Sequence, residues 1–347
     1  MNKNLFIIIL IVISLIFTSI IFKDSTNRKA VNNLQSIVKA ELALEKNQSL
    51  VVFDSKSPFS FNNIFNGLTD FEDQTVFGVL TLPKINQNKK FPLIIGVAGS
   101  MGWRNHHYEY MNQYLDNGFA VFALHSFKSR NVNSTVGSQV KVTTPMIIHD
   151  VYMALNKLSK NPSIQAENIG ITGWSLGGGV ALFSGWTPIQ SLLSPNLKFK
   201  AHLPIYPPCM VHPDDLNFTD APIHILIGED DNWVPAEACI ELIEKMPDNK
   251  NISITVYPDA HHSFDSNKKI REISHSYSFS DCRLRLSDDG VVRMNKTGFP
   301  LSTPALQKIG LAFCAARGTT VGQNLEAKRN ALEFSLNFMK KHLNNNQ

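Results

Sequence analysis

The stretch Ile169-Gly170-Ile171-Thr172-Gly173-Trp174-Ser175-Leu176-Gly177-Gly178-Gly179 decides how this chain folds. Apolar and β-branched residues lead into Gly-x-Ser-x-Gly, and glycines then open an apolar segment, so the order is strand, sharp turn, helix. A serine at the apex of such a turn sits in strained backbone, and the residues two positions away must be small. The following helix directs N–H groups to the place where an oxyanion would form. Ser175 is therefore the candidate nucleophile.

Length and composition describe an ordinary globular protein. The 347 residues allow one large α/β domain or two small ones, and 43% of them are hydrophobic. The formal charge of +4 is small and is not gathered into a basic stripe. Composition therefore argues against a nucleic-acid partner.

The N-terminus predicts export. Residues 5–22 carry no charge and reach the threshold length of a membrane span. No small-residue cleavage site follows, so residues 1–23 are read as an uncleaved signal-anchor rather than a cleaved signal peptide. Residues 24–74 are polar and asparagine-rich, as in a stalk with a short amphipathic helix at 31–44. We expect an exported body, periplasmic or otherwise extracytoplasmic, that is anchored to the membrane by residues 5–22.

Four cysteines fit such a compartment, although four free buried thiols are the alternative. Their even number allows three pairings. Cys209 follows one predicted strand and Cys239 opens the helix after the next, so these two should meet on one face of a sheet. Cys282 and Cys314 fall in one late segment, which a disulfide between them would hold together.

Strand and helix patterns alternate along the rest of the chain. The apolar runs predict strands at 76–83, 91–99, 118–124, 169–174, 199–207, 223–228 and 252–257, with helices at 108–116, 145–160 and 235–246. Alternation of this kind predicts a mostly parallel central sheet with helices on both faces. The functional site then belongs at the carboxyl ends of the strands. No repeat or linker divides residues 75–347, so we expect one domain there.

The loop Gly99-Ser100-Met101-Gly102 ends a buried strand and is the first candidate for an oxyanion hole. The backbone N–H of Ser100 or Met101 would supply one arm, and the N–H of Leu176 the other. An ordinary tight turn is the alternative.

Candidate acids and bases follow the next two strands. Asp230 and Asp231 come after the strand at 223–228, and His261 and His262 after the strand at 252–257. A carboxylate there could orient a histidine that reaches Ser175, whereas an exposed acidic turn is the alternative. Neither this histidine pair nor the pair at 106–107 makes a convincing metal site, because adjacent residues rarely bind one ion well.

These motifs together resemble the dienelactone hydrolase family of the α/β-hydrolase superfamily, from about residue 76 to the C-terminus. The resemblance is carried by Val97-Ala98-Gly99-Ser100-Met101-Gly102, Gly173-Trp174-Ser175-Leu176-Gly177-Gly178, Ile227-Gly228-Glu229-Asp230-Asp231-Asn232-Trp233-Val234-Pro235 and Tyr257-Pro258-Asp259-Ala260-His261-His262-Ser263-Phe264-Asp265. The chain order Ser, Asp, His is that of α/β-hydrolases. The resemblance selects Asp231 as the triad acid and His262 as the triad histidine.

The chain departs from the family pattern in several places. Ser175 stands where the dienelactone hydrolases that name the family have cysteine, which points to an esterase-like branch. Ala98 replaces a frequent histidine. Arg130 lies in a segment similar to one in this branch, where it would contact an acidic substrate or form a structural ion pair, and Trp174 is a second possible substrate contact. Residues 266–320 are an insertion that we expect to form a flap near the site.

The resemblance implies a serine hydrolase that cleaves a small-molecule carboxylic ester or lactone through an acyl-enzyme, without a metal or organic cofactor, as a monomer or homodimer. A peptidase or acyltransferase on the same triad is the near alternative. A non-catalytic binding protein that kept the hydrolase fold is the alternative from another class.

Overall fold

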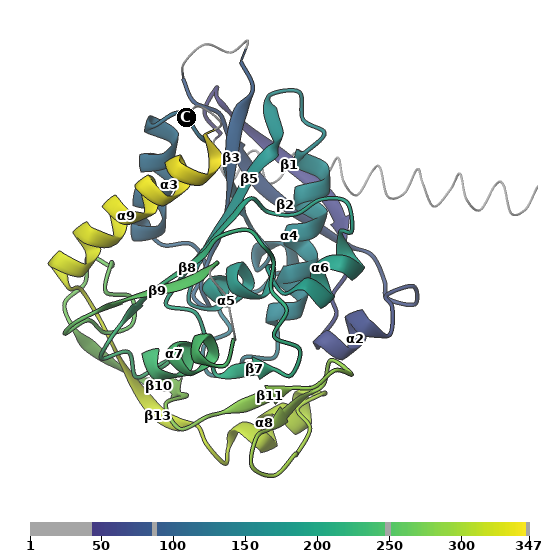
Figure 1. The fold of residues 1–347 in the computed structure, drawn as a ribbon, viewed down its shortest axis with the longest axis vertical. Coiled ribbons are helices and arrows are strands. Elements are labelled where there is room, and N and C mark those ends of the chain that lie inside the picture. The colour runs from purple at the N-terminus through teal and green to yellow at the C-terminus, as the bar shows by residue number, and fades with distance from the viewer. Residues whose placement is uncertain (1–43, 85–88, 247–250, 345–347) are drawn as a thin grey trace, which may run out of the picture.

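The central feature of the fold is an eight-stranded sheet with the order β1-β2-β4-β3-β5-β6-β8-β9 (Figure 1). The computed structural model describes residues 44–84, 89–246 and 251–344. The strands of this sheet are β1 (Gln48–Ser55), β2 (Gln74–Thr81), β3 (Phe91–Val97), β4 (Ala120–Leu124), β5 (Ile164–Trp174), β6 (Ala201–Ile205), β8 (Ile223–Gly228) and β9 (Ile252–Tyr257).

The sheet is mostly parallel, as expected from the alternating pattern. Strand β2 pairs antiparallel with both β1 and β4, and the other adjacent pairs are parallel. Its central strands are fully enclosed, because Ile94, Ile171, Leu203 and Ile225 are 0% exposed. Burial of each such side chain contributes roughly 1.5–3 kcal/mol, which explains why these strands read as continuous apolar runs.

Helices cover both faces of the sheet (Figure 1). On one face α3 (Asn105–Asp116) packs against α9 (Leu325–Leu343), which also contacts β5 and β6. On the other face α5 (Leu176–Phe183) packs against the same two strands and against α4 (Thr144–Leu158). Two further helices are α6 (Thr187–Leu193) and α7 (Ala236–Glu244), and α7 packs along β9.

The N-terminal part of the sheet differs from the expectation that residues 24–74 form a polar stalk. Strand β1, which the sequence analysis assigns to the polar stalk, pairs with β2 over its full length and buries Phe53. Its apolar core is only four residues long between polar ones, so the sequence pattern alone is weak, and pairing with β2 decides the structure. Helix α2 (Phe61–Phe65) follows, and its capping box is formed by Ser60 and Asn63.

The predicted signal-anchor and the amphipathic helix of the stalk, apart from residue 44, lie outside the described residues. Within 44–84, 89–246 and 251–344, no helix is both long and apolar enough to cross a bilayer.

The insertion at 266–320 builds two small sheets at one end of the molecule, the lower end in Figure 1. Strands β10 (Arg271–Ser278) and β13 (Ala316–Val321) pair antiparallel. Strand β11 (Leu284–Leu286) joins β12 (Val292–Met294) to β7 (Val211–Pro213), which belongs to the main part of the chain. Helix α8 (Pro304–Leu311) completes the insertion, and the short 3-10 helix η1 (Lys128–Arg130) lies before α4.

Candidate active site

Ser175 occupies the turn between β5 and α5 in a backbone conformation that non-glycine residues rarely adopt, with φ 55° and ψ −118°. Its N–H donates to the Ile205 carbonyl at 2.9 Å. Small neighbours are required, because a Cβ at Gly173 would lie 2.1 Å from the carbonyl oxygen of Gly177. The strain, of order 1–3 kcal/mol, is typical of a functional turn and holds the hydroxyl at the strand end.

His262 lies in the loop after β9 and meets this hydroxyl. Its Nε2 is 3.0 Å from Ser175 Oγ, and its Nδ1 is 2.7 Å from Asp231 Oδ2. The ring of Tyr206 packs edge-on against the imidazole at 4.7 Å, and Trp233 packs at 4.9 Å. The histidine is 2% exposed, so its orientation is fixed by packing as well as by hydrogen bonds.

Asp231 is held by the backbone that follows β8. Its Oδ1 accepts the N–H groups of Trp233 at 2.9 Å and Val234 at 3.0 Å, which leaves Oδ2 for the histidine. Asp230 is exposed, and its contacts are made by its backbone: its N–H donates to the Ala260 carbonyl at 3.0 Å, and its own carbonyl lies 3.0 Å from His261 Nδ1. The structure thus brings together Ser175, His262 and Asp231, and it leaves the neighbouring Asp230 and His261 outside the group.

The expected oxyanion donors lie beside the serine. The turn 99–102 is closed by a 2.9 Å hydrogen bond from its last N–H to its first carbonyl, and Ser100 and Met101 are its central residues. A Cβ at the first position would lie 3.3 Å from the Ser175 Cβ, so this turn is in direct contact with the serine. Leu176 is the first residue of α5, where backbone N–H groups have no helical partner.

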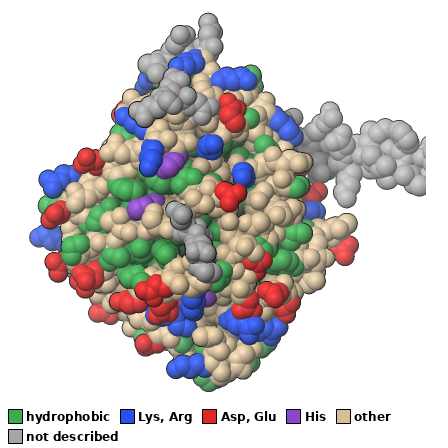
Figure 2. Space-filling model, viewed as in Figure 1, with side chains coloured by type: hydrophobic (Ala, Val, Ile, Leu, Met, Phe, Trp, Pro, Cys, Tyr) green, Lys and Arg blue, Asp and Glu red, His purple; other side chains and the backbone are tan. Residues whose placement is uncertain are grey.

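A cavity of about 300 Å³ opens over these residues and is lined by both Ser175 and His262. Arg104, at the start of α3, and Lys268 and Arg271, from the insertion, stand on its rim as exposed side chains. None of the three forms an ion pair with another described residue, and no carboxylate lines the cavity in the part of the chain that the structure describes. The rim is therefore positive. On the face shown in Figure 2, by contrast, basic and acidic side chains are interspersed.

The insertion contributes to this cavity as expected of a flap. Ile273 on β10 and Val321 at the end of β13 also line it. The backbone of Val321 forms a parallel bridge with His262, so the insertion returns directly to the histidine loop.

The two possible substrate contacts are placed differently. Trp174 lines the cavity, although it is 0% exposed and stacks on His107 at 4.5 Å between centroids. Arg130 makes a bidentate ion pair with the fully buried Asp150 at 2.7 and 3.0 Å and donates to Ser57 at 3.0 Å. Of the two roles expected for Arg130, the structure shows the structural ion pair, and Arg130 does not line this cavity.

Both expected disulfides are present. Cys209 is bonded to Cys239 with a Cα–Cα distance of 4.9 Å, and Cys282 to Cys314 with 5.0 Å. Two disulfides indicate an extracytoplasmic location, because reducing compartments keep such thiols reduced.

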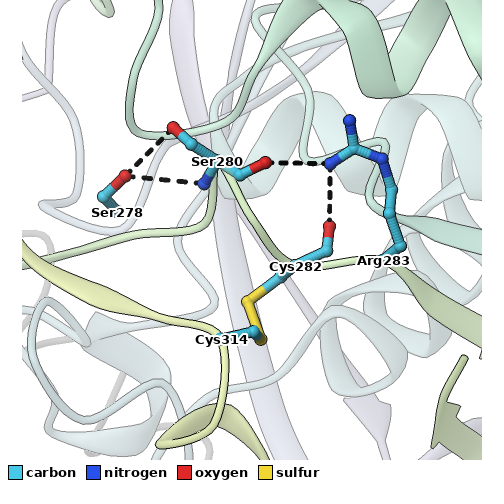
Figure 3. Close-up of a disulfide and its surroundings, with 5 residues drawn as sticks. All are labelled: Ser278, Ser280, Cys282, Arg283 and Cys314. Carbon is cyan, nitrogen blue, oxygen red and sulfur yellow. Dashed lines mark hydrogen bonds between the residues drawn. A yellow bond between two sulfur atoms is a disulfide. The ribbon is translucent and has the colours of Figure 1, made fainter. Parts of the chain in front are cut away.

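The second disulfide joins the loop between β10 and β11 to the segment between α8 and β13, and hydrogen bonds surround it (Figure 3). Arg283 donates to the carbonyls of Ser280 at 2.9 Å and Cys282 at 3.0 Å, and it forms an ion pair with Glu241 on α7. The insertion is therefore fixed to itself covalently and to the main body by charge.

Sequence reasoning missed three polar residues that gather beside the triad histidine. They are His106, Tyr206 and Asp265. Asp265 stands among mostly polar residues in the sequence, so no pattern there marks it as buried. His106 was considered only as half of a metal-binding pair. No group of three or more potential metal ligands occurs among the described residues.

Comparison with known proteins agrees with this geometry. The sequence profile of the dienelactone hydrolase family matches residues 77–282. No curated protein matches the chain significantly by sequence. A solved structure of a candidate dienelactone hydrolase from Klebsiella pneumoniae subsp. pneumoniae MGH 78578 superposes with TM-score 0.50 at 13% identity, covering 84% of this chain and 99% of that one. The protein m3DLH gives TM-score 0.52 at 13% identity, with 86% and 100% covered.

At such identities the two structures show the fold alone, whereas the family rests on the sequence match, which spans more than half of the chain. The chain belongs to the dienelactone hydrolase family and has the α/β-hydrolase fold.

Proposed function

We propose that this protein is a serine hydrolase that cleaves a carboxylic ester or lactone through an acyl-enzyme. The observation that carries the proposal is the unbroken chain of contacts from Asp231 through His262 to Ser175, with distances of 2.7 and 3.0 Å. The serine hydroxyl attacks the carbonyl carbon while His262 Nε2 takes its proton. Asp231 keeps the other proton on Nδ1 and stabilises the imidazolium that forms.

The negative charge that develops on the carbonyl oxygen is received by backbone N–H groups. Leu176 supplies one of these, and Ser100 or Met101 supplies the other. Such donors are already in position before the reaction, so they need little reorganisation, and one donor is typically worth about 10²–10³ in rate.

The acyl-enzyme forms when the bond from the carbonyl carbon to the leaving oxygen breaks, and the same groups then hydrolyse it. His262 gives its proton to the leaving alkoxide, which departs as the alcohol. It next takes a proton from water, whose oxygen attacks the acyl carbon, and finally returns that proton to Ser175. For a lactone the alcohol and the acid are the two ends of one product.

The size of the cavity supports a small substrate. Its volume of about 300 Å³ lies at the lower end of the range for ligand sites. Aromatic side chains and the insertion enclose it, which limits the access of a folded protein.

The test is labelling of the purified extracytoplasmic part of the chain with a fluorophosphonate probe, followed by peptide mapping and assay with p-nitrophenyl acetate. We expect an adduct on Ser175 that is absent from Ser175→Ala and strongly reduced in His262→Ala. The neighbouring His261→Ala is the matched control and should label normally. Labelling that is equal in all four proteins, or absent from the unmodified protein together with absent ester hydrolysis, would refute the proposal.

We propose in addition that the protein is exported and stays anchored through residues 5–22. The charge-free run of this segment and the two disulfides support this location. Fractionation followed by mass analysis tests it, because complete release with residues 1–22 missing would contradict the anchor.

A further inference from the structure

A buried carboxylate lies beside the triad without a role in it. Asp265 is three residues past His262 and is 0% exposed. Its Oδ1 accepts the hydroxyl of Tyr206 at 3.0 Å, but its Oδ2 has no hydrogen-bond partner among the described residues. An unmade hydrogen bond on a buried carboxylate costs free energy, so this arrangement calls for an explanation in terms of function.

His106 connects this carboxylate with the cavity. It belongs to the first turn of α3, and its ring lines the same cavity as Ser175. Its Nε2 lies 3.8 Å from Asp265 Oδ1 and makes no hydrogen bond to any described residue. The residue is 9% exposed, so its ring is an inner wall of the cavity and not part of the rim.

The surroundings define which hydrogen bonds His106 can make. Burial lowers the pKa of its imidazole from 6.5, and Lys328 and Arg104 lower it further, against the opposing effect of Asp265 and Glu109. The ring is therefore neutral at pH 7. At 3.8 Å the two groups do not form a hydrogen bond, but the negative carboxylate favours the single ring proton on Nε2, the nitrogen that faces it. Nδ1 then carries a lone pair, and it can only accept.

The side chains on the rim of the cavity cannot accept a hydrogen bond. Lys268, Arg271 and Arg104 are cations, and their side chains only donate. A neutral histidine beside a carboxylate adds an acceptor at the inner wall of the cavity that Ser175 also lines.

We infer that His106, oriented by Asp265, is a specificity-determining residue that accepts a hydrogen bond from a donor group next to the scissile carbonyl of the substrate. The preferred substrates are then esters or lactones that carry a hydroxyl or an amide N–H near that carbonyl. This inference rests on the proposed hydrolase function and specifies its substrate class.

The test uses four lactones that share one ring: γ-butyrolactone, its α-hydroxy and α-acetamido derivatives, and its γ-carboxylate. Their kcat/KM values are measured with the unmodified protein, with His106→Leu, which has no acceptor, and with His106→Asn, whose amide oxygen can replace Nδ1. We expect His106→Leu to lower kcat/KM for the two donor-bearing lactones by about 10- to 100-fold, mainly through KM. The loss for γ-butyrolactone should be clearly smaller than the loss for these two, because it carries no donor for His106 to accept, and His106→Asn should recover part of the difference.

Two results would overturn the inference. A similar loss for all four lactones in His106→Leu would show a structural role, and a loss confined to the γ-carboxylate would show anion binding. Labelling of Ser175 by the fluorophosphonate probe in each variant reports separately on the triad.

If the unmodified protein hydrolyses none of the lactones, the proposed function fails for this class of substrate. The role of His106 is then tested by the binding of the lactones instead of their hydrolysis. The lactones are then titrated into Ser175→Ala and observed by ligand NMR. Equal affinity for γ-butyrolactone and its α-hydroxy derivative would contradict the inference, whereas tighter binding of the hydroxy form that is lost with His106→Leu would support it.

Discussion

Among the residues that the structure describes, two groups combine a serine, a histidine and an aspartate, and only one of them lines the cavity described above. In the first, Ser175 and Asp231 contact opposite nitrogens of His262. The second ties β1 to α4 and consists of Ser55, His149 and Asp150, which we call the β1–α4 group. There the serine hydroxyl lies 2.8 Å from His149 Nδ1 and donates to Asp150 Oδ1 at 2.5 Å.

The two groups differ in the contacts of the imidazole and the carboxylate, and in the access of the serine to a cavity. In the β1–α4 group His149 Nδ1 is also the acceptor for the N–H of Lys56 at 3.1 Å, and the carboxylate of Asp150 is neutralised by Arg130. Ser55 is 2% exposed and lines no cavity described above. The same three residue types therefore form the proposed catalytic relay in one place and a structural clamp in the other, and geometry and access distinguish the two.

The largest expected effect separates the two serines. Ser175→Ala should lower kcat for p-nitrophenyl acetate by about 10⁴-fold or more, because it removes the nucleophile. Ser55→Ala should leave kcat within about twofold and lower the free energy of unfolding by about 1–3 kcal/mol. Steady-state kinetics and urea unfolding measure the two. A comparable loss of kcat in folded Ser55→Ala would contradict the contrast.

A smaller effect is expected for the carboxylate of the triad. In Asp231→Asn the amide oxygen can still accept the two backbone N–H groups, but the amide nitrogen then faces His262 and favours the wrong tautomer. We expect kcat to fall by about 10³–10⁴-fold with little loss of stability. Asp230→Asn, one position away and exposed, is the control and should keep normal kinetics. Retention of most activity in Asp231→Asn would remove this residue from the mechanism.

The carboxylate of the β1–α4 group should affect stability instead. Asp150→Asn leaves the buried guanidinium of Arg130 without its counter-charge, so the free energy of unfolding should fall by about 3–5 kcal/mol. Activity per folded molecule should be unchanged. Asp54→Asn, an exposed carboxylate on β1 next to Ser55, is the control and should shift the urea midpoint little. A midpoint for Asp150→Asn equal to that of the control would show that the ion pair contributes no net stability.

The smallest effect is acid sensitivity of histidines outside the triad. Burial lowers the pKa of His149, with Asp150 opposing, and it lowers the pKa of His202 to about 4. The unfolded chain therefore binds more protons below about pH 6.5, and stability is lost as pH falls from there towards the folded-state value. For His202 the loss between pH 7 and pH 5 should be about 2 kcal/mol. Urea midpoints at both pH values, compared with His202→Gln and His149→Gln, should show a flatter dependence in the variants, and an unchanged slope would contradict the assignment.

Much of the fold could be predicted because the central strands are enclosed on both faces, which leaves an unmistakable apolar pattern. The site residues could be named because Ser175, Asp231 and His262 each follow a strand in a short motif. Strand β1 escaped prediction because an edge strand depends on its partner more than on its own sequence. The role of Arg130 stayed open between two alternatives, and that of His106 escaped prediction, for a related reason: the partner of each, Asp150 or Asp265, is 20 or more residues distant in the chain.

The insertion has a consequence for how this protein could have evolved. Its two ends meet, because the N–H of Gln323 donates to the Lys268 carbonyl at 2.8 Å and that of Gly322 to the His262 carbonyl at 3.1 Å. A short turn could join these ends, so the whole segment is a cassette that an ancestor could have gained, exchanged or lost in one event. The segment contributes Lys268 and Arg271 to the cavity, and the disulfide between Cys282 and Cys314 stabilises it internally. Each exchange would therefore supply a new cavity wall together with the disulfide that stabilises it. Substrate preference within such a lineage would then change by exchange of the whole segment rather than by substitution of single residues.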